Sequence, residues 1–311
     1  MLSVLIPVFN EAENVAAIAR HVEAAIVESG MAGEILLVDD GSTDATWREI
    51  TNLHSTRCTL RGLRLSRNFG KEAAISAGLD ACRGDAVIVI DGDGQHPPSC
   101  IPEMVEKWRT GADVVQGIKV DRGDSAVSRW RAEVFYGVFR RFAGLDLRGA
   151  SDFKLLDRRV VQVLRQMPER ATFFRGMTSW VGFRQDRVDY HVAARGAGSS
   201  KWSLLKLAGL AVTALTSYSA LPLRLASLVG VLFLLFAVVL GAQTLYVYLS
   251  GQALSGFATV ILLTLIASSL VLLSLGIIGE YLGRIYDEVK ARPRYLVAEG
   301  WELGGDDKDG A

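Results

Sequence analysis

Cysteine, histidine and net charge are all scarce in this chain of 311 residues. The three cysteines, Cys58, Cys82 and Cys100, lack metal-ligand or redox spacing, and their odd number argues against a disulfide framework. The 34 basic and 34 acidic residues cancel, whereas a nucleic-acid-binding domain carries a basic excess. We therefore expect free thiols in a reducing cytosol, no nucleic-acid partner, and basic sites that are only local.

Charged residues are absent altogether between Arg224 and Glu280. Two segments of this interval, 226–249 and 257–279, are apolar and long enough to cross the hydrocarbon core of a bilayer, which takes about 20 residues. A hairpin buried in a soluble bundle is the alternative, and hydropathy over such a length disfavours it. The sequence therefore predicts two transmembrane helices joined by a short uncharged turn.

Basic residues flank both ends of this hairpin, and basic flanks favour the cytoplasmic side. They are Lys201, Lys206 and Arg224 before it, and Arg284, Lys290, Arg292 and Arg294 after it. We predict a multi-pass protein of the inner (plasma) membrane with its N-terminal domain and both termini in the cytoplasm. The expected parts are a cytoplasmic domain (1–200), an interfacial amphipathic helical segment (201–224), the two membrane helices (225–282) and a cytoplasmic tail (283–311). A third crossing at 203–221 stays open as an alternative.

Short apolar stretches alternate with amphipathic ones in the first 100 residues. The predicted strands are 2–8, 34–38, 62–65 and 86–90, and the predicted helices are 14–28, 43–53 and 71–81. This alternation predicts an α/β fold with a mostly parallel sheet, in which ligands bind beyond the carboxyl ends of the strands. We reject a dinucleotide-binding Rossmann domain, because the first strand leads into Pro7-Val8-Phe9-Asn10-Glu11 and not into a G-x-G-x-x-G turn.

Two carboxylate motifs stand at predicted strand ends. The run from Asp39 to Asp44 combines a turn and a helix cap with an aspartate, Asp39, that we expect to accept hydrogen bonds from a base or ribose. In Asp91-Gly92-Asp93, two carboxylates can hold Mg²⁺ or Mn²⁺, which prefer oxygen ligands and also bind a diphosphate. Such a cation would neutralise the charge on a departing nucleoside diphosphate. His96, in the turn that follows, is interpreted as structural.

Four motifs occur in order along the chain: Pro7 to Glu11, the Asp-Asp-Gly-Ser-x-Asp run, the D-x-D sequence with its following Gln-x-Pro-Pro, and the stretch from Arg195 to Lys201. Together they resemble the family 2 glycosyltransferases of GT-A fold, specifically the polyprenyl-phosphate branch with bactoprenol glucosyltransferases and dolichol-phosphate mannose synthases. The resemblance covers nearly the whole chain. It implies a Rossmann-like GT-A domain followed by interfacial helices and a two-helix transmembrane hairpin.

The resemblance also assigns residues to roles. It implies that the nucleotide-sugar contacts Pro7, Val8, Asn10, Glu11, Asp39, Asp91 and Gln95. It implies that Asp91 and Asp93 hold the metal and that Asp93 and Asp152 are catalytic. Lys and Arg provide the charge and the donors that a phosphate needs. We therefore expect the lipid phosphate at Lys119, Arg122, Arg129, Arg131, Arg195, Ser200 and Lys201.

The predicted reaction is inverting transfer of a hexose from a nucleotide-sugar to polyprenyl (undecaprenyl) phosphate, with UDP-glucose or a related UDP-hexose as first donor candidate and GDP-mannose next. A phosphate acceptor, with a second pKa of about 6, needs positioning more than deprotonation, so Asp152 would orient it or take a residual proton. A processive polysaccharide synthase is one alternative, but it would carry more membrane spans and a Gln-x-x-Arg-Trp motif, and this sequence has neither. A non-enzymatic scaffold is another, and the intact carboxylates of Asp39, Asp91, Asp93 and Asp152 disfavour it. Glycines in the spans permit helix association, and the resemblance suggests a homotetramer.

Overall fold

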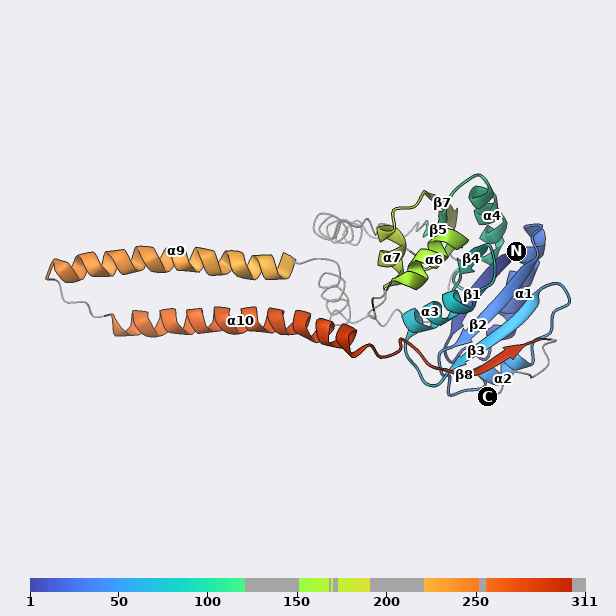
Figure 1. Cartoon of the computed structure of the whole chain (residues 1–311), viewed down its shortest axis with the longest axis horizontal. Helices are drawn as coiled ribbons and strands as arrows, with labels where there is room; N and C mark the ends of the chain where they lie inside the picture. The colour runs from blue at the N-terminus through green and yellow to red at the C-terminus, as the bar shows by residue number, and fades with distance from the viewer. Residues whose placement is uncertain (121–150, 168, 170–172, 191–220, 252–255, 304–311) are drawn as a thin grey trace. The chain divides into compact units, whose positions relative to one another are not determined.

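The protein is described from a computed structural model, which defines residues 1–120, 151–167, 169, 173–190, 221–251 and 256–303 (Figure 1). The chain divides into two compact units. One consists of Met1–Ser200 together with Pro293–Ala311, and the other of Lys201–Arg292. The first unit is the α/β domain expected from the alternating pattern, and the second contains the charge-free interval.

The α/β domain is built on an eight-stranded sheet of order β7-β5-β6-β4-β1-β2-β3-β8 (Figure 1). The strands are β1 (Leu2–Val8), β2 (Gly33–Asp39), β3 (Thr59–Leu65), β4 (Ala86–Val89), β5 (Val114–Lys119), β6 (Lys154–Asp157), β7 (Gln185–Tyr190) and β8 (Val297–Glu302). The β3, β2, β1 and β4 strands run parallel to one another, whereas β6 and β8 are antiparallel to their neighbours. Because β6 is antiparallel to both β4 and β5, and β7 is parallel to β5, six of the eight strands run in one direction, in agreement with the mostly parallel sheet that the sequence predicts.

Helices cover both faces of this sheet. On one face lie α1 (Val15–Glu28), α2 (Thr46–Thr51) and α4 (Ile101–Arg109), with the short 3-10 helix η1 (Pro98–Cys100) leading into α4. On the other lie α3 (Lys71–Ala81), α6 (Arg158–Gln166) and α7 (Phe174–Trp180). Every residue of β1 is buried, because alternate side chains enter the two helical layers. A strand covered on both faces reads as a continuous apolar run, which is why β1, β2 and β4 were recognisable in the sequence.

The predicted strands and helices of the first 100 residues are confirmed, with their ends shifted by up to three residues. The first strand has the predicted bounds, Leu2–Val8, and α3 begins and ends as predicted, at Lys71 and Ala81. The largest shifts fall on α2, which begins at Thr46, and on β3, which begins at Thr59. The parallel order β3-β2-β1-β4 brings the carboxyl ends of these strands to one edge of the sheet.

The strand β8 is the main departure from the expected organisation. We expected a separate tail from residue 283, but Pro293–Ala311 groups with the α/β domain and β8 pairs with the edge strand β3. Backbone hydrogen bonds extend the pairing at both ends, from the Ser66 amide to the Leu296 carbonyl (2.9 Å) and from the Leu303 amide to the Leu60 carbonyl (3.0 Å). The chain thus leaves this domain, forms the apolar helices, and returns to complete the sheet.

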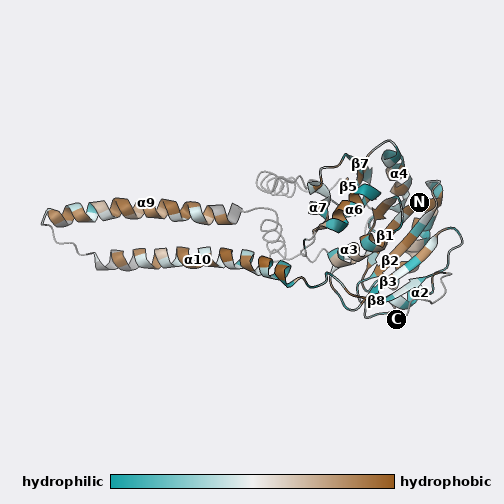
Figure 2. Ribbon diagram, in the orientation of Figure 1, coloured by the Kyte–Doolittle hydropathy of each residue, from teal (hydrophilic) through white to brown (hydrophobic). Residues whose placement is uncertain are grey.

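The second unit contains two long helices, α9 (Leu221–Leu249) and α10 (Phe257–Lys290). Figure 2 shows mainly apolar residues along most of α9 and α10. The stretches Leu225–Val247 and Leu263–Lys290 are long and apolar enough to cross a membrane. Helix α10 continues past the predicted end at 279, and its last turns carry an Arg284–Glu280 ion pair of 3.1 Å.

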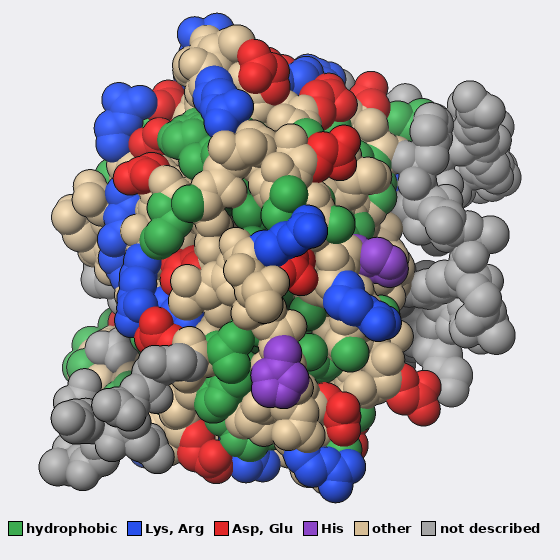
Figure 3. All heavy atoms as spheres, turned by 90° about the vertical axis from the view of Figure 1, so that its right-hand side faces the viewer, with side chains coloured by type: hydrophobic (Ala, Val, Ile, Leu, Met, Phe, Trp, Pro, Cys, Tyr) green, Lys and Arg blue, Asp and Glu red, His purple; other side chains and the backbone are tan. Residues whose placement is uncertain are grey.

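The surface of the α/β domain is mixed in charge. On the face seen in Figure 3, acidic and basic side chains are interspersed with apolar ones. Ion pairs such as Arg64–Glu299 (3.0 Å) and Arg83–Glu302 (3.0 Å) join β8 to the rest of the domain. Exposed pairs of this kind each contribute about 0–1 kcal/mol, so the backbone pairing of β8 is the larger part of its attachment.

Candidate active site

A cavity of about 330 Å³ opens at the carboxyl ends of β1, β2 and β4. It is lined by Pro7, Val8, Phe9, Glu11, Asp40, Asn68, Gly70, Lys71, Ala74, Asp91, Gly92 and Asp93. Its volume is at the lower end of the range of small-molecule sites, and its position is where parallel α/β sheets bind ligands. Five of the predicted donor-site and metal residues, namely Pro7, Val8, Glu11, Asp91 and Asp93, therefore share one cavity.

Asn10 and Asp39 hold the loops behind this cavity and are not among the residues that line it. Asn10 has a left-handed backbone, with φ of 53°, and its side-chain oxygen accepts the Thr43 amide hydrogen at 2.9 Å. Asp39 is fully buried and accepts the Ser42 amide hydrogen at 2.9 Å. Its other carboxylate oxygen is buried without a hydrogen-bond partner among the described residues.

Asp40, the second aspartate of that motif, lines the cavity and fixes the loop before α3. Its two oxygens accept the amide hydrogens of Phe69 (2.8 Å) and Gly70 (2.9 Å). Gly70 has φ of 98° and Gly41 has φ of 68°, and a Cβ at Gly41 would lie 2.3 Å from the Arg67 carbonyl carbon. Glycine is required at both turns, which together place the first residue of α3 against the strand ends.

Asp91 and Asp93 follow β4, and nearby groups hold their loop. The Gln95 amide donates to Asp93 Oδ1 at 3.0 Å, and the Gln95 side-chain amide donates to Asp93 Oδ2. The Asp91 amide donates to His96 Nδ1 at 3.2 Å, and the His96 ring stacks on Phe153 at 5.2 Å. Burial lowers the pKa of His96, which favours its neutral form. These contacts agree with the structural role expected for His96 and give Gln95 a supporting role beside Asp93.

Lys71 joins two carboxylates that come from distant parts of the chain. Its Nζ lies 2.5 Å from Asp91 Oδ1 and 2.6 Å from Asp152 Oδ2. Burial would lower the pKa of Lys71, but the two carboxylates raise it, so the ammonium form is stabilised. Lys71 was not predicted as a site residue. It is the first residue of a helix, and no pattern in the neighbouring sequence shows that it contacts Asp152, which is 81 residues away.

Arg175, at the start of α7, holds the other side of Asp152. Its Nε donates to Asp152 Oδ1 at 2.7 Å and its Nη2 to Asp152 Oδ2 at 2.9 Å. Burial alone would raise the pKa of Asp152, but the bonds and charges of Arg175 and Lys71 outweigh burial and hold that pKa well below its usual range. Asp152 is thus an ionised and fully paired carboxylate, suited to positioning and unsuited to accepting a proton near neutral pH.

Two further ionisable groups, one partly buried and one fully buried, support α7 next to this pair. The Glu72 carboxylate accepts the Phe174 amide hydrogen at 2.7 Å, and burial raises the pKa of Glu72 to about 7. Lys154 Nζ donates to the Thr178 hydroxyl at 2.5 Å, and burial lowers the pKa of Lys154 to about 8. Both groups dock α7 and so place Arg175.

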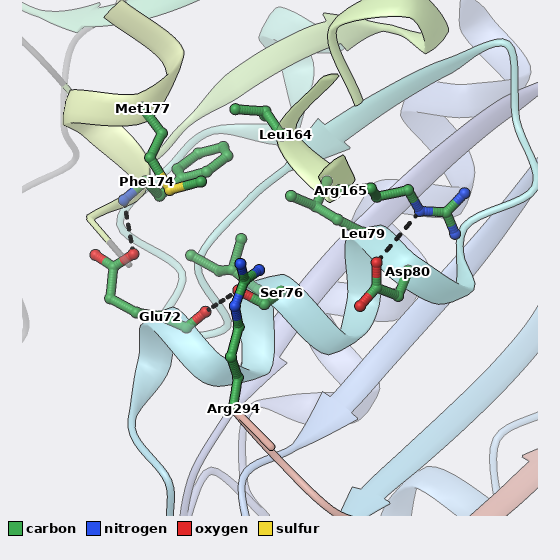
Figure 4. Close-up of a pocket in the computed structure, with 10 residues that line it drawn as sticks. Glu72, Ser76, Leu79, Asp80, Leu164, Arg165, Phe174, Met177 and Arg294 are labelled. Atoms are coloured by element: carbon green, nitrogen blue, oxygen red, sulfur yellow. Dashed lines mark hydrogen bonds and ion pairs between the residues drawn. The ribbon is translucent and has the colours of Figure 1, made fainter. Parts of the chain in front are cut away.

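Figure 4 shows the small cavity that lies beneath α7, lined by residues of α3, α6 and α7 and by Arg294. Its volume of about 20 Å³ holds one water molecule and excludes a substrate. Glu72 points toward the Phe174 amide on one side, and Arg165 pairs with Asp80 (3.4 Å) on the other (Figure 4). The wall of this cavity is therefore structural, and the larger cavity at the strand ends is the candidate active site.

Most of the predicted lipid-phosphate residues lie outside the described part of the chain. They are Arg122, Arg129, Arg131, Arg195, Ser200 and Lys201. Lys119 is described, at the exposed end of β5. The structure thus places Asp91 and Asp93 in one cavity and links Asp152, which does not line it, to Asp91 through Lys71. Lys71 and Arg175 are two cations that the sequence did not predict.

A mixed α/β sheet with helices on both faces, and a cavity with two aspartates beyond its strand ends, is the architecture expected of a GT-A fold. Residues 3–166, more than half of the chain, match the model of the family described as Glycosyl transferase family 2. The chain belongs to this glycosyltransferase family.

Relatives match along nearly the entire chain. An uncharacterized glycosyltransferase of Synechocystis, sll0501, is 39% identical, with 97% of this chain and 96% of the relative covered. A prophage bactoprenol glucosyl transferase homolog of Escherichia coli is 37% identical, over 95% of this chain and 98% of the relative. The bactoprenol glucosyl transferase of Shigella phage SfII is 38% identical, over 95% and 97%.

Solved structures show more distant likeness. A mannosyl-3-phosphoglycerate synthase from Rubrobacter xylanophilus is 18% identical with a TM-score of 0.47, over 68% of this chain and 71% of that one. A glucosyl-3-phosphoglycerate synthase from Mycobacterium tuberculosis, in complex with Mn²⁺ and UDP-glucose, is 19% identical with a TM-score of 0.46, over 70% and 77%.

Proposed function

We propose that the protein transfers glucose, with inversion, from a nucleotide-sugar to a polyprenyl phosphate at the cytoplasmic face of a membrane. One observation carries the proposal: a cavity with the carboxylates of Asp91 and Asp93 and the ammonium of Lys71 occurs in a chain that is similar, over 95% of its length, to bactoprenol glucosyl transferases. The names of these relatives support glucose as the sugar and bactoprenol phosphate as the acceptor. UDP-glucose is the first donor candidate and GDP-mannose the second.

A divalent cation, Mg²⁺ or Mn²⁺, fits the chemistry of this cavity. The carboxylates of Asp91 and Asp93 both line the cavity, and Asp91 Oδ1 lies 2.5 Å from the Lys71 ammonium, so this oxygen already holds a positive charge that a cation could replace. No group of three or more His, Cys, Asp or Glu that could hold a metal occurs among the residues the structure describes. Mg²⁺ is commonly held by one or two carboxylates and completed by substrate phosphates. Asp91 and Asp93 would hold such a cation, which would stabilise the charge of the leaving diphosphate.

The reaction itself asks the protein mainly for positioning. A phosphate oxygen of the acceptor forms a bond to the anomeric carbon while the bond from that carbon to the diphosphate breaks, and the nucleoside diphosphate leaves with the electron pair. A phosphate monoester with a second pKa of about 6 is largely dianionic at neutral pH, so no general base is needed. Asp152, held ionised by Arg175 and Lys71, orients these two cations beside the reacting groups.

The apolar helices and β8 support the proposed membrane location. Because β7 and β8 belong to one sheet, the chain between Tyr190 and Val297 leaves a water-exposed domain and returns to it. Such a segment crosses a bilayer an even number of times. Two crossings, by α9 and α10, meet this condition and favour an interfacial role for 201–224 over a third crossing. The basic flanks favour the cytoplasm for the α/β domain and both termini.

The direct test uses membranes that contain the full chain, a panel of labelled nucleotide-sugars, and undecaprenyl phosphate. We expect UDP-glucose to label the lipid that is extracted into organic solvent, and Asp93→Ala to abolish this labelling. Asp186→Ala serves as the control and should label normally. It removes an exposed carboxylate of β7 that pairs with Lys107 of α4. Failure of every donor to label the lipid refutes the proposal, and normal labelling by Asp93→Ala refutes the site.

A further inference from the structure

Lys71 contacts Asp91, the carboxylate that we propose as a ligand of the divalent cation. Its Nζ lies 2.5 Å from Asp91 Oδ1, and an ammonium and a metal ion cannot both bind this oxygen at such a distance. The same Nζ lies 2.6 Å from Asp152 Oδ2. The Lys71 side chain is 40% exposed and lines the cavity, so it has room to move.

The two carboxylates depend on Lys71 to different degrees. Asp152 is also bound by Arg175, through hydrogen bonds of 2.7 Å and 2.9 Å. Asp91 has no second cation of this kind among the described residues. His96 Nδ1 lies 3.7 Å from Asp91 Oδ2, but this nitrogen accepts the Asp91 amide hydrogen and so cannot donate to the carboxylate. When Lys71 leaves Asp91, that carboxylate is therefore exposed to a new partner, whereas Asp152 stays paired.

We propose that Lys71 is a positioning residue that competes with a divalent cation for Asp91, and that cation binding shifts Lys71 onto Asp152 and the phosphate groups in the cavity. Cation binding at Asp91 and the placement of the positive charges around Asp152 then become one coupled event. This inference rests on the proposed function, because it takes Asp91 as a cation ligand. It adds a role for a lysine to which the sequence motifs assign none.

Competition predicts a change in cation affinity, on replacement of Lys71, that is opposite in direction to the change expected for a purely structural lysine. An ammonium within ion-pair distance of a ligand oxygen occupies the lone pairs of that oxygen and repels an incoming dication. This repulsion is stronger in a partly buried site than in water, because the effective dielectric constant is lower there. Removing the charge of Lys71 should therefore tighten cation binding, although it should weaken sugar transfer. A residue that merely builds the site would, on removal, weaken both.

The experiment measures Mn²⁺ binding to the purified full-length chain by electron paramagnetic resonance, without nucleotide-sugar, in parallel with lipid labelling. We expect Lys71→Met to bind Mn²⁺ about tenfold more tightly than the unaltered chain and to transfer sugar at least about tenfold more slowly. Lys71→Arg keeps the charge and should bind Mn²⁺ within about twofold of the unaltered chain. Lys107→Met, the same charge change at a lysine of α4 that pairs with Glu103 and Asp186, should leave Mn²⁺ binding unchanged.

Unchanged or weaker Mn²⁺ binding by Lys71→Met overturns the inference. Lys71→Gln, which also removes the charge and adds polarity, provides a second test if Lys71→Met does not fold. Asp91→Asn separates this failure from that of the proposed function, because it should abolish Mn²⁺ binding in both the unaltered and the Lys71→Met chains. If Asp91→Asn binds Mn²⁺ normally, the assignment of the cation to Asp91 is wrong and the competition falls with it.

Discussion

The guanidinium of Arg175 binds both carboxylate oxygens of Asp152, at 2.7 Å and 2.9 Å. Two-point binding of this kind fixes the plane of the carboxylate as well as its charge. Because the pKa of Asp152 is held well below its usual range, this carboxylate stays ionised near neutral pH. The sequence suggested orientation of the acceptor or uptake of a residual proton, and the paired carboxylate supports the first role.

Asp152→Asn is the substitution that separates the two roles. It keeps the shape of the side chain but loses the charge that holds Lys71 and Arg175, and misplacement of groups at a reacting centre costs about 10²-fold in rate. We expect kcat to fall by about that factor while the shape of the pH–rate profile between pH 5.5 and 8 stays the same. Any limb near pH 6 then belongs to the acceptor phosphate. Loss of the acid limb in Asp152→Asn would instead identify Asp152 as the titrating base.

Glu72 makes the stability of the domain depend on pH. Its pKa is 4.5 in the unfolded chain and about 7 in the folded one, owing first to burial, so between these values the folded state binds more protons. Stability contributed by this group therefore falls as pH rises from about 4.5 to about 7. Glu72→Gln keeps an acceptor for the Phe174 amide and removes the charge. We expect it to be more stable than the unaltered chain at pH 8, by about 1–3 kcal/mol, and equally stable at pH 4.5.

Thermal unfolding in detergent at the two pH values measures this difference. Glu103→Gln, at an exposed position of α4, is the matched control and should follow the unaltered chain at both. A Glu72→Gln chain that is equally or less stable at pH 8 would show that Glu72 is paired well enough to remain ionised at no cost.

The strand β8 should stabilise the α/β domain although it follows the apolar helices. A chain that ends at Arg292 loses the β3–β8 pairing and the hydrogen bond from the Tyr295 hydroxyl to Asp80 (2.7 Å). We expect its apparent Tm to fall by roughly 5–10 °C, and its newly open β3 edge to promote aggregation. A chain that ends at Leu303 keeps β8 and should unfold as the full chain does. Equal unfolding of both truncated chains would show that β8 adds no stability.

The topology can be tested by cysteine labelling in whole cells. In a chain whose three natural cysteines are replaced by alanine, Ser250→Cys lies in the turn after α9, and Glu28→Cys lies on the surface of the α/β domain. We expect a membrane-impermeant maleimide to label the first in intact cells and the second only after permeabilisation. Labelling of Glu28→Cys in intact cells would contradict the cytoplasmic placement of the domain.

The sequence was sufficient for the features that depend on neighbouring residues. Buried parallel strands appear as apolar runs, so β1, β2 and β4 could be read directly, and the ends of those strands gave Asp91 and Asp93. The different surroundings of Asp39 and Asp40 could not be read in this way. Both stand at the end of β2, but Asp40 binds the loop before α3 and lines the cavity, whereas Asp39 is fully buried, and its contact with the nucleotide stays a prediction.

Features that join distant segments were not predictable from local pattern. Lys71 and Asp152 are 81 residues apart, and their contact depends on β6 lying beside β4. Strand β8 gives no alternating signal, since the residues around Gly300 are mostly exposed, and its partner strand lies on the other side of a long apolar interval. Arg175 is placed by α7, whose position depends on the hydrogen bond from the Phe174 amide to the Glu72 carboxylate.

The pairing of β3 with β8 also sets an order of events during synthesis. About 230 residues separate Leu65 from Val297, which at about 5–20 residues per second corresponds to a delay on the order of 10–50 s on the ribosome. During that time β3 is an unprotected edge, able to pair with other chains. The strand β8 can be added to the sheet only after both apolar helices have been synthesised. A ribosome that stalls in the hairpin therefore leaves β3 as an unpaired edge, and a domain with all eight strands is always one whose membrane segment has been made.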